Sequence, residues 1–96
     1  MPSPRVTVGI TTRNRAKILP TAIDSVLRQD FKDLEIVVLD DASTDQTPDL
    51  AIEYPEIRWH RNGKPLGIIA CRNKLMKESQ ADFYLSLDDD AWFLRD

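Results

Sequence analysis

The chain has 96 residues, enough for one small domain with a limited hydrophobic core. Sixteen acidic residues against 13 basic residues give a net charge of −3, and the basic residues are scattered, which disfavours a nucleic-acid-binding surface. The single cysteine, Cys71, excludes an internal disulfide. No apolar run approaches the roughly 20 residues that cross a bilayer, and no signal-peptide pattern is present. These features predict a cytoplasmic protein without a transmembrane segment, whose longer parent is at most peripheral to a membrane.

Hydrophobic patterning predicts that strands and helices alternate along the chain. Val6, Val8 and Ile10 recur with the period of a strand, whereas residues 18–27 carry apolar side chains at four-residue spacing, as in an amphipathic helix that begins near Pro20. The predicted strands are residues 5–11, 36–39, 57–60 and 83–87, and the predicted helices are residues 20–27, 48–53 and 66–79. This order predicts an α/β fold with a mostly parallel sheet of about four strands between helices.

Two details of the helices are also expected from the sequence. Ser43 or Thr44 is expected to cap the helix over residues 48–53, because short hydroxyl side chains satisfy free amide groups at helix starts. The helix over residues 66–79 is expected to pack through Ile69, Leu75 and Met76.

Acidic residues follow two of the predicted strands. Asp40 and Asp41 come directly after the apolar run 36–39, and Asp88, Asp89 and Asp90 follow the strand over residues 83–87. Each cluster alone is compatible with a simple turn or a helix cap. Open parallel sheets bind ligands beyond the carboxyl ends of their strands, so the two clusters together favour a metal-assisted site for an anionic ligand.

Four segments carry a family resemblance. VTVGITTRNR, EIVVLDDASTDQT, GIIACRN and YLSLDDDA, in this order, resemble the nucleotide-sugar-binding half of a family 2 glycosyltransferase with the GT-A fold, over about residues 5–93. The resemblance implies a three-layer, Rossmann-like domain covering residues 1–96. It also implies that this chain is an N-terminal fragment, with the acceptor-binding part and the catalytic general base lying beyond Asp96.

The resemblance assigns roles to the acidic triplet and to a divalent metal. Asp90, together with Asp88, matches residues that bind Mn²⁺ or Mg²⁺, and Asp88 or Asp89 matches a residue that contacts the ribose or reaches the metal through water. A cation held between carboxylates and phosphate oxygens stabilises the negative charge that develops on a departing nucleoside diphosphate.

The remaining nucleotide-binding residues are assigned in the same way. Asp41 or its neighbour Asp40 matches the acceptor for a base N–H, most simply uracil N3–H, because a carboxylate only accepts hydrogen bonds. Thr11 matches a residue that lines the base pocket, Arg13 lies near it, and Arg72 reaches a nucleotide or one of the acidic clusters. For Arg13 a solvated loop position is equally compatible with the sequence, and Arg72 could simply neutralise nearby acids.

The resemblance implies that the parent enzyme transfers a sugar from a UDP-linked donor to an acceptor hydroxyl with inversion, and that the isolated chain is inactive. Two other classes remain: a non-catalytic nucleotide-binding fragment and a Mg²⁺-binding, receiver-like signalling domain, although the latter should carry its acid pair after the first strand. His60 has no partner at metal-ligand spacing and reads as a strand-surface residue, and Cys71 reads as a packing residue. Apolar surface left uncovered is expected to favour self-association.

Overall fold

The computed structural model describes residues 4–92 and forms one α/β layer structure. Its elements are β1 (Val6–Thr12), α1 (Leu19–Leu27), β2 (Leu34–Asp40), the 3₁₀ helix η1 (Thr47–Asp49), α2 (Leu50–Glu53), β3 (Arg58–Arg61), α3 (Ile68–Glu78) and β4 (Phe83–Asp88). The predicted alternation of strands and helices is confirmed. No helix in the described range is long and apolar enough to cross a membrane.

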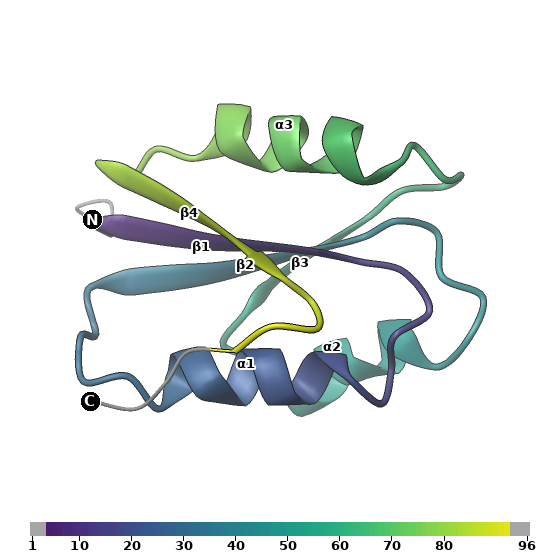
Figure 1. Ribbon diagram of the computed structural model, residues 1–96, viewed down its shortest axis with the longest axis horizontal. Coiled ribbons are helices and arrows are strands. Elements are labelled where there is room, and N and C mark those ends of the chain that lie inside the picture. The colour runs from purple at the N-terminus through teal and green to yellow at the C-terminus, as the bar shows by residue number, and fades with distance from the viewer. Residues whose placement is uncertain (1–3, 93–96) are drawn as a thin grey trace.

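The four strands form one parallel sheet in the order β3-β2-β1-β4. Helices α1 and α2 cover one face and α3 covers the other, as Figure 1 shows. The connections through α1 and α2 build the sheet from β1 towards β3, and the connection through α3 then crosses to the opposite edge. The strand order therefore reverses at β1, and the carboxyl ends around that strand are the expected ligand position in such a sheet.

Alternating residues of the strands face two separate hydrophobic clusters. Val8 and Ile10 of β1 pack with Ile36 and Val38 of β2 against α1, whose buried residues include Leu19 and Ile23 on its apolar stripe. The opposite cluster lies under α3 and consists of Val37, Leu39, Cys71 and Leu75, with Tyr84 packed against it. Both faces of the central strands are therefore buried, which explains why residues 36–39 are continuously apolar.

Gly9 permits a close approach between β1 and the Tyr84 side chain from β4. A Cβ atom at Gly9 would lie 2.1 Å from the Tyr84 hydroxyl oxygen and 2.7 Å from Cζ. The hydroxyl is buried and has no hydrogen-bond partner among residues 4–92, and its burial raises the pKa of Tyr84. The aromatic ring thus occupies the space that a side chain at position 9 would need.

Of the two detailed expectations about the helices, the first is wrong and the second is confirmed only for Leu75. Neither Ser43 nor Thr44 caps the segment after β2, which starts as η1 after Gln46 without a side-chain cap. In α3, Leu75 is buried as expected, but Ile69 and Met76 are 72% and 52% exposed, and Cys71 takes the second buried position. Cys71 and Leu75 are one helical turn apart, so they define the face that meets the sheet.

Candidate functional site

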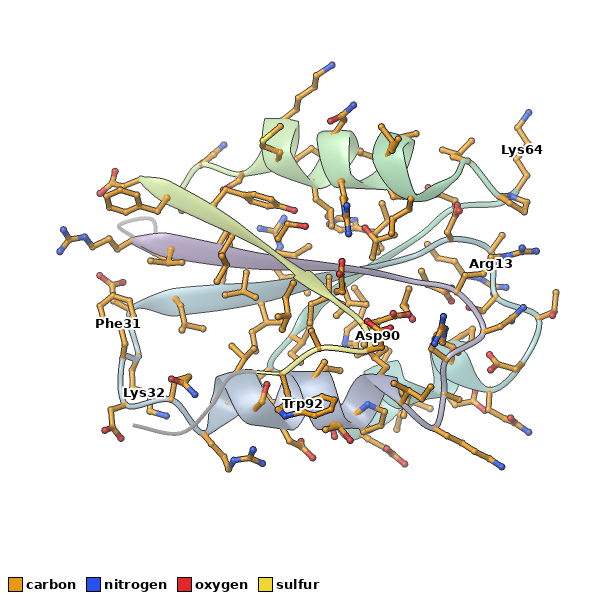
Figure 2. The ribbon with its side chains drawn as sticks, viewed as in Figure 1. Arg13, Phe31, Lys32, Lys64, Asp90 and Trp92 are labelled. Atoms are coloured by element: carbon orange, nitrogen blue, oxygen red, sulfur yellow. The ribbon has the colours of Figure 1, made fainter. Side chains whose placement is uncertain are left out.

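A cavity of about 310 Å³ opens at the carboxyl ends of the strands. It is lined by the last residues of β1, by residues that follow β1, β2 and β4, and by the segment that leads into α3: Thr11, Thr12, Arg13, Arg15, Asp41, Pro65, Gly67, Ile68 and Asp89. Figure 2 shows the Arg13 side chain at this end of the molecule. Two arginines and two aspartates line the cavity, so it offers both cationic and anionic contacts to a polar ligand.

The alternation of side chains along β2 separates the two adjacent aspartates. Val38 faces the α1 cluster and Leu39 faces the α3 cluster, and the same alternation directs Asp40 and Asp41 to different sides. Asp41 lines the cavity, whereas Asp40 lies outside its lining. The geometry thus favours Asp41 as the residue that meets a ligand.

Asp41 is held by donors from β3's end and from the segment before α3. Its Oδ1 accepts hydrogen bonds from Asn62 Nδ2 at 2.9 Å and from the Leu66 amide at 2.8 Å, and its Oδ2 accepts one from the Gly67 amide at 2.9 Å. Burial acts to raise the pKa of Asp41, but these bonds and one from the Cys71 thiol outweigh it and lower the pKa. The carboxyl group is therefore a fixed, ionised acceptor.

Asp40 instead organises the turn that follows β2. Its Oδ1 accepts hydrogen bonds from the amide and the hydroxyl of Ser43, and its Oδ2 lies 3.7 Å from Arg61 Nε. Arg61 also donates to the Ser43 carbonyl oxygen at 2.7 Å. Within the turn from Asp40 to Ser43, Ala42 has a φ of 60°, a left-handed conformation that the surrounding hydrogen bonds maintain. These contacts explain Asp40 as a turn-forming residue.

The acidic triplet at the end of β4 divides its contacts between neighbouring elements. Asp88 pairs with Arg72 of α3, and Asp89 accepts a hydrogen bond from the Thr12 hydroxyl at 2.9 Å and lies 3.9 Å from Arg15 Nε. Desolvation is the main cause that raises the pKa of Asp89, although Thr12 and Arg15 oppose it. Of the three acids, only Asp89 lines the cavity.

The donor chemistry of the triplet suits a hard divalent cation. Within residues 4–92 no three His, Cys, Asp or Glu side chains already converge on one point. Mg²⁺ and related ions, however, commonly bind through one or two protein carboxylates together with substrate phosphates, so a preformed cage of three side chains is not needed. Asp88 and Asp90, which are exposed, offer carboxylate oxygens of this kind.

The cavity unites part of the set predicted from sequence and adds residues that sequence reasoning missed. Thr11, Arg13, Asp41 and Asp89 line it, whereas Asp40, Arg72, Asp88 and Asp90 stand outside its lining. The missed residues are Thr12, Arg15, Pro65, Gly67 and Ile68. The one available signal was Gly67 near the start of the helix predicted over residues 66–79. The structure begins α3 at Ile68, and Gly67 has a φ of 94° and a ψ of 157°, a conformation largely restricted to glycine.

Comparison with known proteins identifies relatives of this chain. The family model described as glycosyl transferase family 2 matches residues 7–96. The putative colanic acid biosynthesis glycosyl transferase WcaA of Escherichia coli is 33% identical over 92 residues, which are 92% of this chain and 33% of that protein. The GalNAc(5)-diNAcBac-PP-undecaprenol beta-1,3-glucosyltransferase of Campylobacter jejuni is 36% identical over 91% of this chain and 30% of that protein. The chain thus spans about a third of the length of these relatives.

Solved structures with the same fold include nucleotide complexes. TarS 1-349 of S. aureus in complex with UDP has a TM-score of 0.85 and 29% identity, covering 92% of this chain and 28% of that chain. The mannosyltransferase PcManGT of Pyrobaculum calidifontis, in complex with GDP-Man and Mn²⁺, has a TM-score of 0.81 and 30% identity, covering 94% of this chain and 28% of that chain.

Proposed function

We propose that this chain, which belongs to glycosyl transferase family 2, binds the nucleoside diphosphate part of a sugar donor in the cavity at the carboxyl ends of its strands. The observation that carries the proposal is the convergence there of Asp41 with Arg13, Arg15 and Asp89. One fixed carboxylate can accept from a base, and cationic side chains can meet phosphates. The related TarS structure in complex with UDP supports a UDP-linked donor.

Asp41 presents only acceptor oxygens to the cavity. The Asn62 side chain, the Leu66 and Gly67 amides and the Cys71 thiol donate to its carboxylate. A carboxylate of this kind suits a ring N–H such as uracil N3–H and disfavours a ring acceptor at the same place. Thr11 lies on the same cavity wall, and its buried hydroxyl has no hydrogen-bond partner in the described structure.

The acidic triplet supplies the second half of the proposed site. Asp90 and Asp88 would hold Mn²⁺ or Mg²⁺, which as a Lewis acid stabilises charge on the diphosphate. Asp89 and Arg72 would lie beside this metal site, because Asp89 lines the cavity and Arg72 pairs with Asp88. The presence of Mn²⁺ in the related PcManGT structure supports the use of a divalent ion.

The activity of a whole protein containing this chain is proposed from the relatives, since the chain spans about a third of their length. Such a protein would transfer a sugar to an acceptor hydroxyl with inversion, using a general base outside the present sequence. The isolated chain would then bind donor without turnover. A cytoplasmic location is part of the same proposal and rests on the single free, buried thiol of Cys71.

Isothermal titration with UDP tests the donor site. UDP is expected to bind in the presence of Mn²⁺ and more weakly without it. ADP and GDP are the control nucleotides that test the preference for uracil. Asp90→Ala should remove the metal-dependent part, whereas Asp82→Ala, an exposed carboxylate before β4, should retain it. If Mn²⁺ still strengthens UDP binding in Asp90→Ala, the metal assignment is contradicted, and absence of UDP binding to the wild-type chain would contradict the donor site in this chain.

A further inference from the structure

Asn14 makes several of the hydrogen bonds that join the loop after β1 to the loop after β2. Its Oδ1 accepts hydrogen bonds from the Thr44 amide at 2.7 Å and the Asp45 amide at 3.3 Å, and its own amide donates to the Ser43 hydroxyl at 2.8 Å. The following Arg15 amide donates to the Thr47 hydroxyl at 3.1 Å. The two loops are therefore connected through both the side chain and the backbone around Asn14.

The backbone of Asn14 is left-handed, with a φ of 54°. Asparagine tolerates this conformation better than most side chains, and most residues with a Cβ atom are strained in it. The reversal occurs between Arg13 and Arg15, and both of these flanking side chains line the cavity. Arg15 also lies beside Asp89, so the same short segment reaches the acidic triplet.

We propose that Asn14 is a positioning residue that fixes Arg13 and Arg15 for contact with the diphosphate of the bound nucleotide. This inference rests on the proposed donor site. Its physical basis is that flexible arginine side chains bind a phosphate more tightly when the backbone that carries them is held in place. Asn14 itself does not contact the ligand, because it acts on the Thr44 and Asp45 amides and is absent from the cavity lining.

The proposal is tested with Asn14→Gly. Glycine keeps the left-handed backbone accessible but removes the acceptor for the Thr44 and Asp45 amides. Titrations of UDP and of uridine, both with Mn²⁺, give the contribution of the diphosphate as the ratio of the two affinities. Asn14→Gly is expected to reduce the affinity for UDP roughly tenfold, the scale of one charge-assisted hydrogen bond, and to leave the affinity for uridine unchanged.

A matched control separates positioning from general loss of stability. Val26→Ala removes buried volume on α1, away from the cavity lining, and should destabilise the fold without changing the ratio of UDP to uridine affinity. A double-mutant cycle then asks whether Asn14 acts through the arginines. When Arg13 and Arg15 are both replaced with Ala, Asn14→Gly should have no further effect on the ratio.

The outcomes distinguish the two proposals. If wild-type protein binds UDP and Asn14→Gly binds it equally well, or loses UDP and uridine affinity together, the positioning role is wrong and the donor site stands. An unchanged effect of Asn14→Gly after removal of both arginines would also overturn it. If wild-type protein binds neither ligand, the proposed donor site fails, and the role of Asn14 fails with it.

Discussion

Gly9 illustrates how a single residue fixes the distance between two parts of the fold. The Tyr84 ring crosses β1 at this point, and a Cβ atom at Gly9 would lie within 2.9 Å of three ring or hydroxyl atoms. Both groups belong to regular strands, so neither can move far without disturbing the pairing of β1 with β4. The close contact explains the only glycine in the strands of the described structure.

Gly9→Ala is expected to lower the free energy of unfolding by about 1 to 3 kcal/mol, because overpacking forces the Tyr84 ring or the backbone to shift. Chemical denaturation measures the change. Gly63→Ala is the matched control, since a Cβ atom there would meet no atom within 4 Å. Adding Tyr84→Leu should restore part of the loss in Gly9→Ala, and equal stabilities of the two alanine variants would refute the steric explanation.

Asp41 links the end of β2 to the start of α3. Its carboxylate accepts from the Leu66 and Gly67 amides directly before α3 and from Asn62 directly after β3. The free amides at the start of α3 lack a side-chain cap of their own. Asp41 therefore contributes to fixing the position of α3 over the sheet, in addition to its place in the cavity.

Asp41→Asn should lower the free energy of unfolding by about 1 to 3 kcal/mol at neutral pH. The amide oxygen is a poorer acceptor than a carboxylate, and the new NH₂ group would face N–H donors that now bond to Asp41. The pKa of Asp41 is lowered below its ordinary value of 3.8 by folding, so its stabilising effect is complete above that value. As the pH falls below 3.8 towards the folded pKa, the unfolded chain takes up the proton first and the effect is lost.

Urea denaturation of wild-type protein and Asp41→Asn as a function of pH measures this effect. The difference between the two proteins should be largest at neutral pH and shrink below the ordinary Asp pKa. Asp82→Asn, which changes an exposed carboxylate, is the control and should differ little from wild type at any pH. A difference for Asp41→Asn that is independent of pH would show that the charge of Asp41 is not responsible.

The same elements show what sequence can and cannot predict. The position of each strand and of α1 follows from local hydrophobic spacing, which is why these elements were predicted within a few residues. The buried face of α3 does not follow in this way, because Cys71 is a weak hydrophobic signal and Ile69 a strong one, yet the sheet covers Cys71 and leaves Ile69 exposed. Which helical face is buried depends on how α3 meets the sheet, a property of the tertiary structure.

The candidate site shows a similar division. Acidic residues at strand ends predicted the edge of the sheet at which the cavity opens, since parallel strands bring their carboxyl ends to one edge. The choice between Asp40 and Asp41 was left open, because it depends on which face of the sheet each successive residue meets. Arg15 was assigned no role in the site, because its place in the cavity depends on the bonds around Asn14, which join residues about 30 positions apart.

For the whole molecule, the order β3-β2-β1-β4 leaves β4 as an edge strand in the described part of the chain. Phe83 and Leu85 of β4 are 58% and 43% exposed, on a strand whose outer backbone groups have no partner strand there. An exposed apolar edge strand is a template for pairing with another chain. A second copy of this chain offers the same edge, so we propose that the isolated chain self-associates through β4.

Multi-angle light scattering over a range of protein concentrations tests this proposal. The average mass of the wild-type chain is expected to rise with concentration, and Leu85→Lys should shift the rise to higher concentration, because a charged side chain on an edge strand opposes pairing. Ile52→Lys is the control, since Ile52 is 82% exposed but lies on α2, away from the edge. A strictly monomeric wild-type chain at high concentration, or an equal effect of the two lysine variants, would exclude β4 as the contact.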